Sequence, residues 1–172
     1  MPPANDDFAS AQTVSGNNGS AAGDNTNGTL QVGEDIYAAA KPNGLGFGGG
    51  KSVWYAWTAL ATATVTFETS SSGASPIVDS VITVCTGGSV STLTVIASDD
   101  DGGTRTYSLV SFAATLGSTY FFAVDGYNGT DPSDPGYNPA NTSEGSFLLS
   151  WDNGIPNPVT PDVTSFDIEM HA

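Results

Sequence analysis

The stretch from Gly48 to Thr69 carries the clearest alternation of apolar and polar positions in the chain. Apolar side chains recur at every second position in two runs separated by a short Thr/Ala turn: Val53, Tyr55 and Trp57, then Ala63, Val65 and Phe67. Such alternation is typical of antiparallel strands with one buried and one solvated face. The pattern predicts a central hairpin, with Trp57 in the core and Trp54 on the opposite face of its strand.

Five more apolar runs are separated by turns rich in Gly, Ser, Thr, Asn and Asp, and no segment has a sustained helical period. They are Val78–Cys85, Leu93–Ala97, Tyr107–Phe112, Thr119–Asp125 and Ser146–Trp151. The first two runs predict a second hairpin, and the next two predict a third antiparallel pair. Short strands at near-regular spacing favour an all-β fold, an antiparallel jelly-roll-like β-sandwich with an extended C-terminal strand. Before them we expect a helical turn at Phe8 and a turn-rich loop from Asn17 to Gly28.

The net charge of the chain argues against some classes of binding partner. The 172 residues include 18 acidic and three basic side chains, which give a net charge of −15. Nucleic acids and anionic membrane surfaces would repel such a chain. No apolar run is long enough to span a bilayer, and no signal peptide is visible. We therefore expect a secreted or cell-surface protein whose leader is absent from this chain.

Six motifs, taken in order, resemble the bacterial pre-peptidase C-terminal domain. They are PANDDFASAQTVSG, GGKSVWYAWTA, ATVTFET, DSVITVCTGGSVSTLTVIASDDD, GSTYFFAVDGYNG and GSFLLSW, and together they cover roughly Pro3 to Trp151. That family includes modules appended to secreted peptidases and the collagen-binding domains of clostridial collagenases. The resemblance implies an extracellular jelly-roll-like sandwich without catalytic activity, often stabilised by calcium. It predicts a sandwich over residues 1–152, followed by a Pro-rich linker and tail at 153–172.

Few residues are suited to catalysis. His171 is the only histidine and Cys85 the only cysteine, which argues against a Ser–His–Asp triad and against histidine-based zinc sites. Cys85 lies in an apolar run, where we expect a buried, inert thiol. Residue types alone leave a paired-carboxylate glycosidase open. The acids nevertheless lie in turns beside Gly and Asn, as calcium ligands or solvated loops do, so we expect no enzyme.

The N-terminal acidic segment is the first candidate for calcium, which takes six to eight oxygen ligands. Asn5, Asp6 and Asp7 match the acidic motif at the start of the family. The resemblance implies that calcium is bound there together with an acidic pair just before the aromatic strand. This chain has Lys51-Ser52-Val53 at that place, and a lysine repels a cation. The alternative role of the segment is a helix cap.

A second calcium candidate is made of five aspartates near the ends of predicted strands. They are Asp79, Asp99, Asp100, Asp101 and Asp125. They would converge at one rim of the sandwich if their strands were neighbours, and crowding them without a cation costs repulsion. The alternative is a solvated turn, with Asp125 hydrogen-bonded to loop backbone.

The tail contains another alternating segment after the prolines at 156, 158 and 161. Phe166, Ile168 and Met170 share one face, with polar side chains between them. Such a segment pairs with a sheet edge, either in its own sandwich or as a strand donated to a neighbouring molecule. It could also begin a further domain.

Together these features predict a non-catalytic, calcium-stabilised structural or adhesive module that self-assembles by strand donation. The alternative function is an accessory module of a secreted hydrolase that binds protein or carbohydrate through Tyr107, Tyr127 and Tyr137. Four Asn-x-Ser/Thr triplets are either glycan acceptors or chance matches in an Asn/Thr-rich sequence. They begin at Asn18, Asn27, Asn128 and Asn141.

Overall fold

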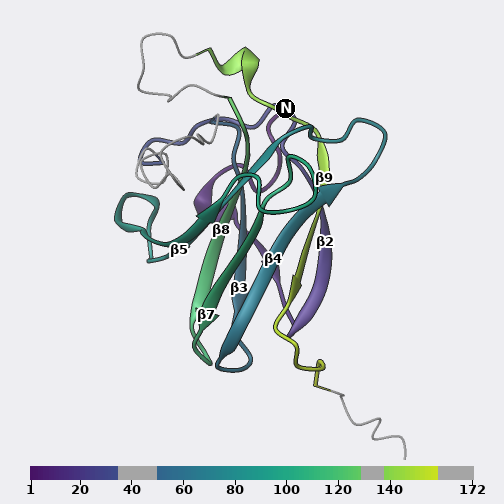
Figure 1. Ribbon diagram of the computed structural model, residues 1–172. Coiled ribbons are helices and arrows are strands. Elements are labelled where there is room, and N and C mark those ends of the chain that lie inside the picture. Colours follow the sequence, from purple (N-terminus) through teal and green to yellow (C-terminus); the bar gives the residue numbers. More distant parts are fainter. Residues whose placement is uncertain (35–49, 129–137, 159–172) are drawn as a thin grey trace, which may run out of the picture.

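The computed structural model describes residues 1–34, 50–128 and 138–158, and in these residues two β-sheets pack face to face (Figure 1). The first sheet has the strand order β1 (Gln12–Val14), β3 (Val53–Thr58), β8 (Thr119–Gly126), β5 (Ser80–Thr86) and β6 (Thr94–Asp99). The second has the order β2 (Asn18–Asp24), β9 (Ser146–Asp152), β4 (Ala63–Ser71) and β7 (Leu109–Ala114). Every pair is antiparallel except β1 with β3. The prediction of an all-β antiparallel sandwich is confirmed.

The central hairpin predicted from the sequence is wrong in its pairing. β3 pairs with β1 and β8, whereas β4 pairs with β7 and β9 in the other sheet. The chain therefore changes sheet between β3 and β4, and it also changes sheet between β7 and β8, so the third predicted pair is wrong as well. Only the second predicted hairpin, β5 with β6, is formed. An alternating strand buries the same side chains against a facing sheet as it does beside a hairpin partner, so the pattern cannot separate these arrangements.

The main core lies between the two sheets and is centred on the ring of Phe67 from β4. Phe67 lies 3.9 Å from Phe122 and 5.5 Å from Trp57, measured between ring centroids, and both of these partners come from the first sheet. Trp57 has no exposed surface, as its alternation predicts. Aromatic side chains bury the largest apolar area per residue, so this cluster holds the sheets together.

A second, smaller core covers the outer face of the first sheet. Trp54 points to this face and is also fully buried, beneath Phe8 of the short helix η1 (Phe8–Ser10), with ring centroids 5.2 Å apart. Leu93 and Cys85 belong to the same cluster. The expectation that one face of this strand is wet is therefore wrong, because the N-terminal segment lies across it. The N-terminal segment is tied to β3 by a hydrogen bond in which the backbone N–H of Trp54 donates to the carbonyl of Asn5 at 2.8 Å.

The expectation of a turn-rich loop from Asn17 to Gly28 is also wrong, because strand β2 lies within these residues. It pairs with β9 along its whole length. A Cβ added at Gly19 would lie 2.5 Å from the ring of Trp151, and one at Gly23 would lie 2.4 Å from the ring of Phe147. The strand therefore needs glycine where aromatic rings approach its backbone, and this composition hides its strand character.

The remaining elements of the described fold are short. Short helical turns occur at η3 (Val90–Thr92) and η4 (Pro139–Asn141). None of the helices in the described part of the chain is long and apolar enough to span a membrane. The predicted tail strand, with Phe166, Ile168 and Met170, lies outside the described residues, and so does Tyr137.

Candidate functional site

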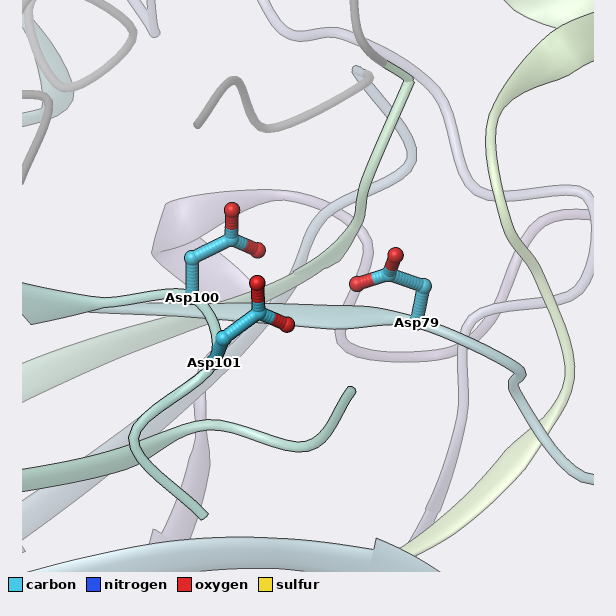
Figure 2. A group of neighbouring side chains, drawn as sticks. All are labelled: Asp79, Asp100 and Asp101. Atoms are coloured by element: carbon cyan, nitrogen blue, oxygen red, sulfur yellow. The ribbon is translucent and has the colours of Figure 1, made fainter. Parts of the chain in front are cut away.

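Three of the five aspartates predicted to converge do so at one end of the β5–β6 hairpin. Asp79 immediately precedes β5, and Asp100 and Asp101 immediately follow β6. Because these strands are antiparallel partners, the start of one lies beside the end of the other. One carboxylate oxygen from each of the three residues lies within 4.8 Å of those of the other two. Figure 2 shows Asp79 approaching from one side, and Asp100 and Asp101 from the other.

Two carboxylate oxygens of this cluster are buried without a hydrogen-bond partner in the described part of the chain. They are Oδ1 of Asp79 and Oδ1 of Asp100. Burial raises the pKa of Asp79 to about 6, and the charge of Asp101 adds to this shift. Burial and the charges of Asp101, Asp79 and Asp99 raise the pKa of Asp100 to about 7. Each of these shifts reflects a carboxylate that needs a proton or a cation.

The other two aspartates of the predicted cluster bind backbone instead. Asp99 accepts hydrogen bonds from the N–H groups of Gly102 at 2.7 Å and Leu109 at 2.8 Å. Asp125 is 2% exposed and accepts from Gly50, Lys51 and Gly126 at 2.7–2.9 Å. It pairs with Val81 in register, and its neighbour Val124 points into the main core. Asp125 therefore lies on the outer face of the sheet. Its hydrogen bonds to Gly50 and Lys51 match the alternative expectation that it binds loop backbone.

The N-terminal candidates are not gathered into one site. The side-chain amide of Asn5 donates to the carbonyl of Trp54 at 3.0 Å. Asp6 accepts from the backbone N–H of Thr29 at 2.7 Å and from its hydroxyl at 2.6 Å. Asp7 occupies the N-cap position of η1 but makes no capping hydrogen bond with its side chain. Asn5 thus ties the segment to Trp54 and Asp6 ties it to Thr29, and among the described residues the three form no group of converging carboxylates.

A buried glutamate that the sequence analysis did not identify is hydrogen-bonded to Trp54. Glu34 has no exposed surface, and its Oε1 accepts from Trp54 Nε1 at 2.7 Å and from Ser52 Oγ at 3.0 Å. Its Oε2 accepts from the backbone N–H of Gln31 at 2.9 Å. Burial raises the pKa of Glu34 to about 7, and the charge of Asp125 adds to the shift. In sequence Glu34 follows Gly33 and precedes another acid, which indicates only an exposed turn.

The predicted ligand-binding tyrosines differ in their surroundings. Tyr107 is half-buried, and its hydroxyl donates to the carbonyl of Ile77 at 3.1 Å. Tyr127 binds the nearby segment through its backbone, with its N–H 3.2 Å from the carbonyl of Asp79. Oδ1 of the next residue, Asn128, is a third buried oxygen without a hydrogen-bond partner in the described part of the chain.

Two surface hollows share Arg105 and Tyr107. One, of about 460 Å³, is lined by polar side chains together with these two: Glu68, Ser70, Ser71 and Thr104. The other, of about 360 Å³, adds Pro76, Ile77, Val78 and Thr106. Both volumes fall within the range of roughly 300–1,000 Å³ typical of small-molecule sites.

The thiol of Cys85 is unsuited to nucleophilic catalysis. It is fully buried beside Trp54, and burial raises its pKa to about 12. The reactive form of a cysteine is the thiolate, which such a pKa suppresses at neutral pH.

The four asparagines of the glycosylation triplets have different surroundings. Asn27 and Asn141 are exposed. The amide of Asn18 donates to the carbonyl of Ile155, and that of Asn128 donates to Asn138 and Thr142. Glycosylation of Asn18 or Asn128 would require these hydrogen bonds to break.

The chain after β9 is held against the turn before β2. The side-chain amide of Asn157 donates to the carbonyl of Asn18 at 2.9 Å, and that of Asn17 donates to the carbonyl of Pro156 at 3.0 Å. Asn153 adds a bond to the side chain of Asn17 at 3.0 Å. The start of the predicted linker is therefore fixed to the sandwich, and the tail leaves from beside β2.

Comparisons with known proteins bear on the fold. The chain matches no family model, and no curated protein matches it. Among solved structures, it is similar to the pre-peptidase C-terminal domain of a collagenase from Bacillus anthracis. The two are 10% identical with a TM-score of 0.45, over 83% of this chain and 94% of that one. It is also similar to CorA of Methylomicrobium album BG8, described as a surface-associated copper-binding protein. This match has 11% identity and a TM-score of 0.48, over 83% of this chain and 97% of that one. The first of these structures is from the family that the sequence motifs resemble.

Proposed function

We propose that this chain is a non-catalytic, extracellular β-sandwich module, with a structural or adhesive role, that Ca²⁺ stabilises at Asp79, Asp100 and Asp101. The observation that carries the calcium proposal is the pair of buried, unpartnered oxygens on Asp79 and Asp100, beside a third carboxylate. Carboxylates are hard oxygen ligands, which suit Ca²⁺ better than the softer metals that prefer imidazole or thiolate. When bound, the ion would neutralise three charges that otherwise repel one another.

The proposed calcium site supports the proposal of an extracellular setting. Calcium sites of extracellular modules bind with dissociation constants of about 10⁻⁴–10⁻³ M, and such weak sites fill only where calcium is abundant. A site with three carboxylates and few other protein ligands belongs to this weak class. The net charge of −15 would add to the attraction of cations.

Thermal unfolding tests the calcium proposal. Calcium at a hundredfold excess over its dissociation constant should stabilise the folded state by about 2.7 kcal/mol. For a chain of this size that corresponds to a rise in Tm of about 5–10 °C over the same protein in EGTA. Equal melting temperatures in EGTA and in about 10–100 mM calcium, a hundredfold excess over such a dissociation constant, would contradict the proposal.

Substitutions locate the site. Asp79→Asn and Asp100→Asn should each remove most of the calcium-dependent shift while leaving the protein folded in EGTA, because each also relieves repulsion. Asp7→Asn is the matched control, since it removes one exposed carboxylate from the N-terminal segment. A shift lost in Asp7→Asn and retained in Asp100→Asn would place calcium at the N-terminus instead.

Self-association through the tail is part of the proposed structural role. The chain leaves the sandwich beside the edge strand β2, held there by Asn157. A segment with Phe166, Ile168 and Met170 on one face could pair with an open sheet edge of a neighbouring molecule. Deleting residues Thr164–Ala172 should leave a folded monomer that no longer assembles, as measured by light scattering. A full chain that is monomeric at every concentration would exclude assembly by strand donation.

A second candidate function is the ligand-binding accessory module of a secreted hydrolase. The observation that favours it is the pair of hollows beside Tyr107. Retention of the protein by immobilised glycan or protein, weakened by Tyr107→Ala, would support this role.

A further inference from the structure

The turn that carries Arg105 has an unusual backbone. Arg105 adopts a left-handed conformation, with φ of +65°, which is uncommon for a residue that is not glycine. Its side chain is exposed, and its guanidinium has no hydrogen bond or ion pair within the described residues. Strained residues persist where the surrounding structure fixes them, and they gather at binding sites. Arg105 therefore places an exposed cation on a turn of unusual backbone conformation, with no partner among the described residues.

Tyr107 provides a fixed aromatic surface beside this cation. Its ring packs against the main core, and its hydroxyl is bonded to Ile77, so the ring cannot rotate freely. Tyr107 and Arg105 each line both hollows. Binding to a fixed ring loses little conformational entropy, which favours association.

The two hollows differ in chemistry. The larger one offers hydroxyl groups and the carboxylate of Glu68, and the smaller one offers the apolar surface of Pro76, Ile77 and Val78. A guanidinium supplies five N–H donors, and a carboxylate accepts through two oxygens. A ligand that fits both hollows has hydroxyl groups at its edge and an apolar face that stacks on the ring.

We propose that Arg105, Tyr107 and Glu68 form a binding site for a neutral polysaccharide, with one sugar ring stacked on Tyr107 and its hydroxyls bonded to Arg105 and Glu68. A polyanionic glycan is disfavoured by the net charge of −15 and by Glu68 itself. Two hollows that share Tyr107 and Arg105 suit an extended chain of sugars. This inference deepens the second candidate function and does not depend on calcium.

The experiment measures binding of neutral hexasaccharides, namely cellohexaose, laminarihexaose, chitohexaose and mannohexaose, by titration calorimetry of the full chain. At least one should bind, and Arg105→Gly should weaken its binding about tenfold, equivalent to about 1.4 kcal/mol. Glycine adopts positive φ without steric cost, so this variant should keep or raise the melting temperature while it removes the guanidinium. Tyr107→Ala should abolish binding, whereas Tyr107→Phe, which keeps the ring, should stay within about threefold of the original.

The controls separate this site from general effects. Lys51→Gln removes the same charge from a residue that lines neither hollow, and it should bind as the original chain does. Immobilised gelatin serves as the protein probe in parallel. Retention on gelatin that Tyr107→Ala abolishes, without binding of any hexasaccharide, would overturn the polysaccharide inference and keep the accessory role. Binding of neither, or sugar binding unchanged in both Arg105→Gly and Tyr107→Ala, would overturn the site as well.

Discussion

Replacing Glu34 by glutamine should change how the stability of this protein depends on pH. Glu34 is fully buried, with Trp54, Ser52 and Gln31 donating to its carboxylate. These bonds favour the charged form, but burial outweighs them and raises the pKa to about 7 from an ordinary value of 4.5. The folded state therefore holds a proton on Glu34 that the unfolded chain releases at lower pH.

The magnitude follows from linkage between protonation and folding. Below about pH 4.5 the carboxyl is protonated in both states, so it adds no pH dependence. Between that pH and about 7 the folded state binds more protons than the unfolded state, and stability falls as pH rises. Each pH unit in this window costs about 1.4 kcal/mol, so the full loss above pH 7 is about 3 kcal/mol.

Glu34→Gln removes this loss because an amide does not titrate. Its oxygen can still accept from Trp54 and Ser52, while the amide nitrogen facing Gln31 loses one hydrogen bond at every pH, at a cost of about 1 kcal/mol. The difference in unfolding free energy between the variant and the original should therefore rise, in favour of the variant, by about 3 kcal/mol from pH 4.5 to pH 8.

Urea unfolding followed by tryptophan fluorescence measures this difference at each pH, in EGTA so that calcium does not contribute. The titrations of Asp79 and Asp100 occur in both proteins and cancel. Glu68→Gln, which removes a carboxylate from a half-buried position on β4, corrects for the change in net charge. A difference that stays constant across the range would refute the reasoning.

Two more predictions test the packing on each side of the first sheet. Trp54→Ala and Trp57→Ala should each cost about 3–5 kcal/mol of unfolding free energy, because both rings are fully buried, and a much smaller loss at Trp54 in urea titrations would show that the outer face is open. Gly126→Ala should destabilise by about 1–3 kcal/mol or more, since a Cβ there would lie 1.7 Å from the carbonyl of Ser143. Gly88→Ala, where no atom lies within 4 Å, is the control and should stay within about 0.5 kcal/mol in thermal melts.

Much of the candidate metal site could be predicted from the sequence. The aspartates beside β5 and β6 can be placed at one rim once the hairpin is recognised, because antiparallel partners bring the start of one strand beside the end of the next. The exclusion of Asp125 depends on its register opposite Val81, which turns its side chain to the outer face. Arg105 is marked in sequence only as an isolated cation in a Gly-rich turn, and its backbone conformation is visible only in the structure.

The sequence by itself determined most of the strands, though not β1 or β2, and which residues of the predicted strands enter the main core. Period-two alternation is a local property, and it identified β3, β4 and β8 with Trp57 and Phe67 inside. Only the tertiary structure decided which strands pair, because facing sheets and hairpin partners bury the same alternate side chains. It also decided the burial of Trp54, which lies beneath Phe8 of the N-terminal segment, and of Glu34, whose carboxylate accepts a hydrogen bond from Trp54. Local pattern therefore fixed the strand faces, and long-range packing fixed what covers each face.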